Sequence, residues 1–324
     1  MSTSTATAVA CPNIAFIKYW GNRDHALRLP ENGSISMNLA GLETRTRVTF
    51  DSSFPMDIFD LNNKRQAGPA LERVLKHLNL LRGLRGISTH AHILSENNFP
   101  TGAGIASSAS GFAALTLAAV TALGLELSEV DLSRLARRGS GSACRSIPAG
   151  FTEWQKGSSD FDSFAFSIAA PEYWPLTDCI ALIEADQKKI SSTEGHSRAA
   201  SSPLQAARVA DSIRRLELCR SAIKNKDFQA LADIIELDSN MLHAVMITSH
   251  PALFYWEPAS LNLIKAVQSW RKAGLGVVYT LDAGPNVHVI CEQGDAESVC
   301  QRMKGMPGVK DVLICHPGGN THLL

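Results

Sequence analysis

The sequence has no excess of charge of either sign. Its 324 residues include 31 Lys and Arg and 31 Asp and Glu, so the net charge is zero when histidine is neutral. A chain with this balance lacks the broad basic surface that binds nucleic acid or an anionic membrane. An anionic ligand must therefore be held by a local pocket. With 45% apolar and 19% charged residues, the composition is that of a globular chain long enough for one large domain or two ordinary ones.

Long apolar runs and a basic amino-terminal segment are also missing. The most apolar stretch, 103–125, is interrupted by serines and threonines, which favours a buried helix over a membrane span. Residues 1–10 contain no Lys or Arg, so we expect no signal peptide. The seven cysteines are odd in number and scattered, a pattern typical of reduced thiols. We therefore expect a cytoplasmic protein.

Cysteine and histidine do not adopt the spacing of a zinc site. Cys315, His316 and His322 lack zinc-finger spacing. His90 and His92 lie on one face of an expected strand, with no evident carboxylate partner. We expect these to be ordinary core or surface residues, and we expect no metal bound by protein ligands alone.

Periodicity predicts strands and helices that do not strictly alternate. The expected strands cover 44–50, 87–94, 179–184, 276–281, 286–291 and 310–315. The expected helices cover 69–81, a long Ala/Leu-rich segment after 108, 128–138 with Ser128 as its N-cap, 204–222, 228–243, 260–272 and 296–303. This mixture favours an α+β fold over a doubly wound sheet. The chain changes character near residue 176 without a linker, so we expect two halves with a shared cleft.

Three distant segments each place a charged residue beside glycine or serine. They are Lys-Tyr-Trp-Gly at 18–21, Gly-Ser-Ala-Cys-Arg at 141–145 and Asp-Ala-Gly-Pro-Asn at 282–286. An ammonium, a guanidinium and a carboxylate suit a site that positions an anionic substrate and moves a proton. They favour an enzyme over a binding module. Each also has a simpler interpretation, because the aspartate can cap a turn, the arginine can form a structural ion pair and the lysine can be exposed.

A glycine- and serine-rich segment precedes the long apolar helix, with Gly102, Gly104, Ser107 and Ser108. Small residues before a helix N-terminus can form a phosphate cradle, although they also serve capping and close packing. The lysine of a P-loop is absent. The βαβ unit that a dinucleotide fingerprint requires is not visible either. A mononucleotide phosphate site is the better interpretation.

Together, these segments resemble the GHMP kinase superfamily and, within it, the diphosphomevalonate decarboxylase family. The matching stretches are 13–39, 97–114, 138–150, 191–195, 237–255 and 279–286, in the family's order. The glycine-serine loop is common to many GHMP kinases, whereas the combination of KYWG, GSACRS and YTLDAGPN is specific to the decarboxylases. The resemblance implies an ATP-binding, ribosomal-protein-S5-like half at 1–176 and a ferredoxin-like half at 177–324. It also implies a homodimer.

The resemblance further implies an ATP-dependent decarboxylation with Mg²⁺. ATP converts the substrate's tertiary 3-hydroxyl into a phosphate ester, and loss of that phosphate lets the carboxylate leave as carbon dioxide. By the match, Asp282 orients or deprotonates the hydroxyl, Arg145 grips the carboxylate and Lys18 balances charge during phosphate transfer. The match also assigns Tyr19 and Ser142 to the substrate, and Gly102, Gly104, Ser107 and Ser108 to ATP.

Two positions depart from the family pattern. Asn22 stands where the decarboxylases continue KYWG with lysine, and Thr193 follows Ser192 where bacterial members often carry arginine. Both positions face the terminal diphosphate in the family. Loss of two cations should weaken binding of a diphosphate. We therefore expect a preference for 5-phosphomevalonate, which would give isopentenyl phosphate.

The alternative is a diphosphomevalonate decarboxylase that makes isopentenyl diphosphate. Arg23, Lys188, His196, Ser197 and Arg198 are nearby groups that can either hold a monophosphate or compensate for the missing charge and restore binding of the diphosphate. A 3-hydroxyl kinase without decarboxylation is another possibility. A non-catalytic GHMP-fold ligand-binding protein is a fourth, and ATP-dependent release of carbon dioxide separates it from the others.

Overall fold

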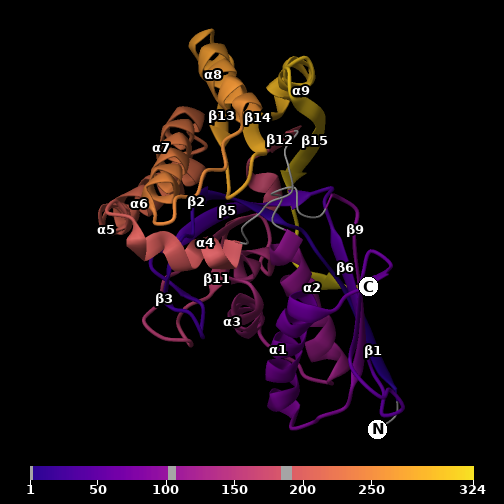
Figure 1. The fold of residues 1–324 in the computed structure, drawn as a ribbon. Coiled ribbons are helices and arrows are strands. Elements are labelled where there is room, and N and C mark those ends of the chain that lie inside the picture. Colours follow the sequence, from indigo (N-terminus) through magenta and orange to yellow (C-terminus); the bar gives the residue numbers. More distant parts are fainter. Residues whose placement is uncertain (1–2, 101–106, 184–191) are drawn as a thin grey trace.

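The computed structural model describes residues 3–100, 107–183 and 192–324. Its helices are α1 (Gly68–Arg85), α2 (Ser107–Ala122), α3 (Glu129–Gly139), α4 (Ser192–Arg198), α5 (Gln205–Ala210), α6 (Ser212–Asn225), α7 (Phe228–Thr248), α8 (Pro258–Lys272) and α9 (Ala296–Lys304), with a 3₁₀ helix, η1 (Gly141–Ser146). Strands and helices are mixed rather than strictly alternating, so the predicted α+β fold is confirmed (Figure 1).

A six-stranded sheet forms one part of the molecule. Its order is β16 (His322–Leu323), β1 (Ser4–Ala10), β6 (Thr44–Phe50), β9 (Ala91–Asn97), β7 (Ile58–Leu61) and β8 (Lys64–Arg65). Helix α2 lies on β1 and β6, and α1 packs beside it (Figure 1). The many alanines of α2 are buried, because small side chains let a helix approach a sheet closely.

An eight-stranded sheet connects the two halves of the chain. Its order is β11 (Ala165–Ala169), β10 (Phe151–Trp154), β5 (Ser34–Ala40), β15 (Val309–Pro317), β12 (Leu176–Ile183), β14 (Val287–Glu292) and β13 (Val277–Thr280), with β2 (Asn13–Ile17) paired to β5. A small hairpin, β3 (Asn22–Asp24) and β4 (Leu29–Pro30), follows β2. Because β5 pairs with β15 and β1 with β16, the end of the chain returns to the first half. The division at 176/177 stays a prediction.

Several expected elements are confirmed and one helix is not. Strand β6 has the predicted bounds, and the Ser128 side chain accepts a hydrogen bond from the Asp131 backbone N–H at the start of α3. The single helix expected at 204–222 is wrong, because the chain divides at Asp211 into α5 and α6. The Asp211 carboxylate binds Arg214 and Arg215 of the following turn, which starts the second helix there. Residues 192–198 form α4, a helix that the sequence pattern did not predict.

The interpretation of His92 on β9 and of His90 just before it also needs correction. His92 Nε2 lies 2.7 Å from Asp60 Oδ2, and His90 Nδ1 lies 3.7 Å from Asp57 Oδ2. Asp60 lies on β7 and Asp57 just before it, and β7 runs parallel to β9. Sequence spacing does not reveal this pairing. Within the described ranges, no helix combines the length and apolar character needed to cross a membrane.

Candidate active site

An ion pair between Lys18 and Asp282 is the first feature of the site. Lys18 follows β2 and Asp282 follows β13, and Lys18 Nζ lies 2.7 Å from Asp282 Oδ1. Only 2% of the Lys18 side chain is exposed, against 29% of the Asp282 side chain. A buried ammonium needs such a partner, because an unpaired charge is costly to remove from water. The pair leaves the carboxylate accessible from outside.

The pKa of Asp282 lies below its ordinary value. Burial by itself raises the pKa of this carboxyl group, but Lys18, His288 and Arg145 outweigh that effect by favouring the negative charge. The group is therefore an ionised hydrogen-bond acceptor at neutral pH.

A buried polar network holds the backbone of Lys18. Its N–H donates to Asp238 Oδ2 at 3.0 Å, and its carbonyl oxygen accepts from Arg208 at 2.7 Å and from Asn32 at 3.0 Å. Asp238 also pairs with Arg215 at 2.9 Å. Buried networks of this kind rigidify the residues they hold, so the core fixes the backbone from which the Lys18 side chain extends.

Arg145 is held by neutral groups. Its Nε donates to Ser36 Oγ at 3.0 Å, and its two terminal nitrogens donate to Ser34 Oγ at 2.6 Å and Asn13 Oδ1 at 3.1 Å. Its pKa is lowered by burial. In the part of the chain that the structure describes, no carboxylate forms an ion pair with Arg145. The structural ion pair considered from sequence is therefore not what holds this residue, and its charge is available to an anion.

Tyr19 and Asn22 lie together beside η1. The Tyr19 hydroxyl donates to Asn22 Oδ1. A Cβ added at Gly141 would lie 2.5 Å from Tyr19 Cε1, so the ring requires glycine there. Asn13 Nδ2 donates to the Ser142 carbonyl at 3.2 Å, which ties η1 to β2. The structure thus brings three residues predicted to contact substrate to one edge of the site.

Helix α4 packs on the KYWG segment through His196. The centre of the His196 ring lies 4.2 Å from that of Tyr19 and 4.5 Å from that of Trp20, and the Gly21 N–H donates to His196 Nδ1 at 3.0 Å. A Cβ at Gly195 would lie 2.6 Å from Trp20 Cη2. Helix α4 is therefore fixed, through Gly195 and His196, against the segment that contains Lys18.

The predicted contacts of α4 with substrate are only partly described. Arg198 pairs with Glu194 one turn earlier on the same helix, so its charge is partly neutralised. Ser192 and Thr193 lie in the backbone of α4, but their side chains are outside the described residues. Their roles, like that of Arg198, stay predictions.

A cavity of about 210 Å³ lies between the six-stranded sheet and helices α1 and α2. Ser107 and Ser108 border it at the start of α2, and the Ser108 hydroxyl lies 3.1 Å from that of Ser140 beside η1. Its apolar walls come from Phe59, Leu61, Val74, Ile93, Phe112 and Leu115. Apolar walls with a few polar groups suit a nucleotide base. Gly102 and Gly104 lie outside the described residues.

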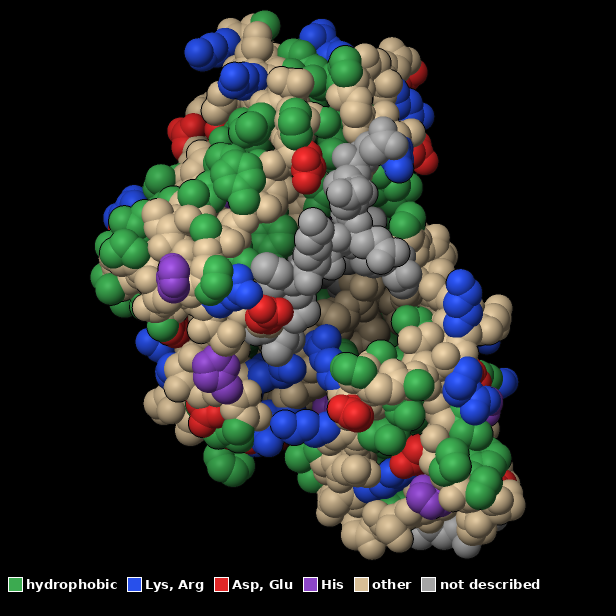
Figure 2. Space-filling view, in the orientation of Figure 1, with side chains coloured by type: hydrophobic (Ala, Val, Ile, Leu, Met, Phe, Trp, Pro, Cys, Tyr) green, Lys and Arg blue, Asp and Glu red, His purple; other side chains and the backbone are tan. Residues whose placement is uncertain are grey.

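Sequence reasoning missed the walls of this cavity. Thr44 and Thr46 line it from β6, and Ser95 and Asn97 line it from β9. For Thr44 and Thr46, the sequence pattern that could have indicated this position is the alternation of β6, which turns small polar residues toward the interior. The space-filling view shows a hollow between the two parts of the molecule, with Lys and Arg side chains at its border (Figure 2).

Comparison with known proteins identifies the family. Residues 10–165 match the diphosphomevalonate decarboxylase-like N-terminal domain, and residues 179–315 match the mevalonate 5-diphosphate decarboxylase C-terminal domain. The diphosphomevalonate decarboxylase of Candida albicans is 39% identical over 312 residues, which cover 91% of this chain and 86% of that protein. The chain belongs to the diphosphomevalonate decarboxylase family. The predicted membership of the GHMP kinase superfamily is confirmed with it.

Other relatives and solved structures agree with this assignment. The Aspergillus fumigatus diphosphomevalonate decarboxylase is 40% identical, over 94% of this chain and 80% of that protein. A structure of MDDEF in complex with MVAPP, AMPPCP and magnesium has a TM-score of 0.95 and 38% identity, covering 100% of this chain and 99% of that one. The mevalonate diphosphate decarboxylase of Staphylococcus aureus has a TM-score of 0.95 and 36% identity, covering 99% and 98%.

Family membership makes this decarboxylase an ATP-dependent enzyme of the mevalonate pathway. The non-catalytic alternative is thereby set aside. The expected preference for 5-phosphomevalonate is not supported, because the relatives named here are diphosphomevalonate decarboxylases. The alternative substrate, the 5-diphosphate, fits the comparisons better.

Proposed function

We propose that this enzyme converts mevalonate 5-diphosphate and ATP into isopentenyl diphosphate, ADP, phosphate and carbon dioxide. The observation that carries the proposal is the accessible Asp282 carboxylate, paired with buried Lys18 at 2.7 Å near an Arg145 guanidinium that no carboxylate of the described residues neutralises. The 39% identical Candida albicans relative is a diphosphomevalonate decarboxylase, and MDDEF binds MVAPP. Both support the diphosphate over the monophosphate.

Asp282 orients the 3-hydroxyl of the substrate for attack on the terminal phosphate of ATP. Because its pKa is lowered, the carboxylate is a weak base and a good hydrogen-bond acceptor. Phosphoryl transfer through a loose transition state needs the nucleophile positioned more than strongly deprotonated. The hydroxyl proton moves to Asp282 as the new O–P bond forms and the bond to ADP breaks. Lys18 offsets negative charge beside the reacting oxygen.

Arg145 binds the substrate carboxylate. A guanidinium has five N–H donors, and the bonds to Ser36, Ser34 and Asn13 use three, which leaves two for a bidentate contact. Holding the carboxylate in this way aligns its C–C bond with the departing phosphate ester. The C–C electron pair then forms the alkene as the C–O bond to phosphate breaks and carbon dioxide leaves.

Ser107 and Ser108 contact the nucleotide at the mouth of the α1–α2 cavity. Within the described residues, no group of three or more His, Cys, Asp or Glu forms a metal site. A site with few protein donors fits Mg²⁺ that arrives with the nucleotide, since Mg²⁺ commonly binds phosphates plus one or two protein oxygens. Asp282 and the Ser107 and Ser108 hydroxyls are the oxygens that would complete its shell. Bound Mg²⁺ supplies charge neutralisation on the transferred phosphate. The structure MDDEF with AMPPCP and magnesium is a precedent for both ligands.

The assay that tests this function is a substrate panel. Mevalonate, its 5-phosphate and its 5-diphosphate are each supplied with ATP and Mg²⁺, and ADP and carbon dioxide are measured together. We expect equal amounts of both products and the highest kcat/KM for the diphosphate. A higher kcat/KM for the monophosphate would reject the proposed substrate, and ADP without carbon dioxide would indicate a 3-kinase. We also propose a cytoplasmic homodimer, which fractionation and sedimentation of the pure protein test.

A further inference from the structure

By the resemblance, positions 22 and 193 are expected to face the substrate's terminal phosphate, and neither carries a cation in this chain. By the resemblance, Asn22 stands where the family carries lysine, and its Oδ1 accepts a hydrogen bond from the Tyr19 hydroxyl. Arg198 is paired with Glu194, and the Arg23 side chain is exposed with its only described bond to the Lys156 carbonyl at 3.4 Å. The inference that follows rests on the proposed diphosphate substrate, because a second phosphate raises the need for positive charge.

Arg28 lies on the same hairpin as Asn22. It ends the turn between β3 and β4, and Asn22 pairs with Pro30 across the hairpin. Leu27 on this turn is held twice, because its N–H donates to Asp24 Oδ1 at 2.8 Å and its carbonyl accepts from Arg137 Nε at 3.2 Å. Arg28 itself has a φ of 51°, which a non-glycine residue rarely adopts. A left-handed residue that its surroundings enforce in this way is often found at ligand-binding sites.

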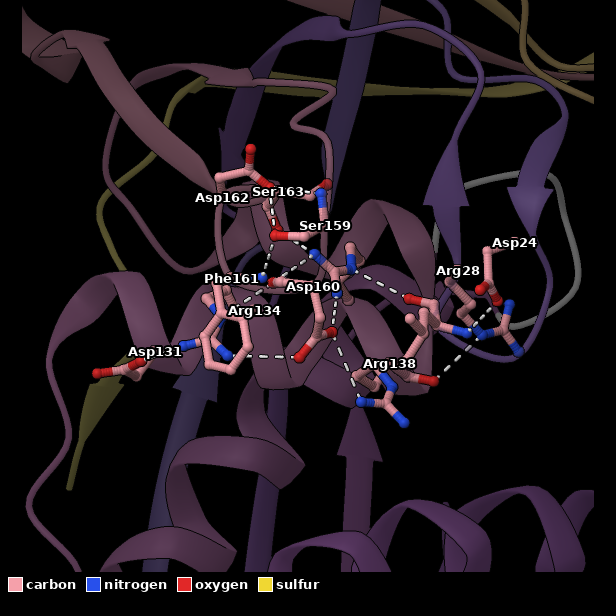
Figure 3. Close-up of polar contacts among 12 residues, drawn as sticks. Asp24, Arg28, Asp131, Arg134, Arg138, Ser159, Asp160, Phe161, Asp162 and Ser163 are labelled. Atoms are coloured by element: carbon pink, nitrogen blue, oxygen red, sulfur yellow. Dashed lines mark hydrogen bonds and ion pairs between the residues drawn. The ribbon is translucent and has the colours of Figure 1, made fainter.

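The Arg28 side chain lies along the end of α3 (Figure 3). Its Nε donates to the Arg138 carbonyl at 3.2 Å. Arg73 of α1 donates to the next carbonyl, that of Gly139, at 3.3 Å. Two residues further on, a Cβ added at Gly141 would lie 2.7 Å from the Tyr19 hydroxyl. The segment 138–141 therefore gathers two arginines and the predicted substrate residue Tyr19 along one edge of the site.

The positive charge of this edge is not balanced by the carboxylates that the structure describes. Arg28 and Arg73 form no ion pair with any described residue, and Arg138 lies 3.5 Å from an Asp160 oxygen that also pairs with Arg137. The Nε atom of Arg73 is buried without a hydrogen-bond partner. Burial first, and then Arg28, lower the pKa of Arg73 to about 10. Mutual repulsion of this kind is typical of a site that awaits an anion.

Arg28 is also within electrostatic reach of Tyr19. Burial raises the pKa of Tyr19 to about 12, and Arg28 is the largest of the influences that oppose this rise. The guanidinium has five N–H donors and uses one on the Arg138 carbonyl, so four remain. These donors match the bidentate geometry of a phosphate group.

We propose that Arg28 binds the terminal phosphate of the substrate diphosphate and takes the place of the cation missing at position 22. The cation is thus supplied by the turn of the hairpin and not by strand β3. This assigns Arg28 as a specificity-determining residue for a diphosphate over a monophosphate.

Steady-state kinetics with five variants test the assignment. Arg28→Leu should raise the KM for mevalonate 5-diphosphate about ten- to hundredfold, with the KM for ATP changed less than about twofold. Arg28→Lys should retain part of the affinity, and adding Asn22→Lys to Arg28→Leu should recover it by several-fold. Arg47→Leu is the matched control, because Arg47 is exposed on the face of β6 opposite the cavity-lining Thr46. A larger effect of Arg23→Leu than of Arg28→Leu would overturn the proposal, as would an equal rise in the KM for ATP.

Calorimetry tests the anion site at Arg28 independently of the proposed reaction. Inorganic pyrophosphate is titrated into the unmodified protein, Arg28→Leu and Arg47→Leu, each saturated with AMPPCP and Mg²⁺ to occupy the nucleotide site. We expect Arg28→Leu alone to lose at least tenfold in affinity. If the unmodified protein does not decarboxylate the diphosphate but Arg28→Leu still loses pyrophosphate affinity, the proposed reaction is wrong and the anion site stands. Equal binding by all three proteins would reject the anion site whatever the reaction.

Discussion

Lys18 Nζ and Asp282 Oδ1 lie 2.7 Å apart although 264 positions separate the two residues in the chain. Lys18 follows β2 in the first half and Asp282 follows β13 in the second, and β2 and β13 belong to one eight-stranded sheet. The Lys18–Asp282 ion pair therefore forms only when the two halves share that sheet. Its geometry depends on long-range strand pairing and not on a local motif.

Asp282→Asn should abolish turnover while ATP binding stays nearly unchanged. The amide keeps the shape but cannot take the hydroxyl proton, and it removes the charge that faces buried Lys18. Loss of a positioned base costs about a hundredfold or more in rate. Rapid-quench measurement of ADP and calorimetry with AMPPCP check the two halves of this prediction. A variant with near-normal turnover would reduce Asp282 to a turn residue.

Arg145→Lys should also fail, with kcat/KM for the substrate reduced about a hundredfold and ATP affinity unchanged. A lysine has a single ammonium, which cannot contact Ser34, Ser36 and Asn13 and also grip a carboxylate in two places. Arg220→Lys is the control, because Arg220 forms a two-pronged contact with Glu153 outside the site. Full activity of Arg145→Lys would show that the position needs only charge.

His77 should make the fold sensitive to acid. Burial first, and then Arg28, Arg138 and Arg73, lower the pKa of His77 to about 3. The unfolded chain binds a proton near pH 6.5. Between these values the unfolded state carries a proton that the folded state lacks, so stability rises with pH across this window and is lost as the pH falls below about 6.5.

His77→Gln should therefore reduce the slope of unfolding free energy against pH by about 1.4 kcal/mol per pH unit between about pH 4 and 6. Glutamine can keep the bond to Thr116 Oγ1 that His77 makes at 2.8 Å. Urea unfolding at pH 4.5, 5.5 and 7 measures the slope, with the exposed His322→Gln as control. Parallel slopes for all three proteins would contradict the prediction.

Gly139→Ala should destabilise the protein by about 1 to 3 kcal/mol. A Cβ at Gly139 would lie 2.1 Å from Phe112 Cδ1, so α3 could not keep its place on α2. Gly83→Ala is the matched control, because no atom lies within 4 Å of its added Cβ and alanine favours a helix interior. Thermal unfolding of both variants should give opposite shifts in Tm, and equal shifts would exclude the clash as the cause.

The sequence by itself determined the family and the α+β fold, and it predicted Lys18 and Asp282 as site residues. KYWG, GSACRS and YTLDAGPN are contiguous motifs, and motifs of this kind carry over from relatives residue by residue. Helices such as α7 and strands such as β6 were visible because each buries one face at a regular period. Strands β2 and β5 were missed, since they are buried on both faces and show no alternation.

Only the tertiary structure decided how distant charges are matched. Asp60 pairs with His92 because β7 runs parallel to β9, and Lys18 pairs with Asp282 because β2 and β13 join one sheet. The structure also brought Arg28 within electrostatic reach of Tyr19 and Arg73, which the sequence around position 22 had not suggested. The physical reason is that a charge acts through space over several ångströms, whereas a sequence pattern records only neighbours along the chain.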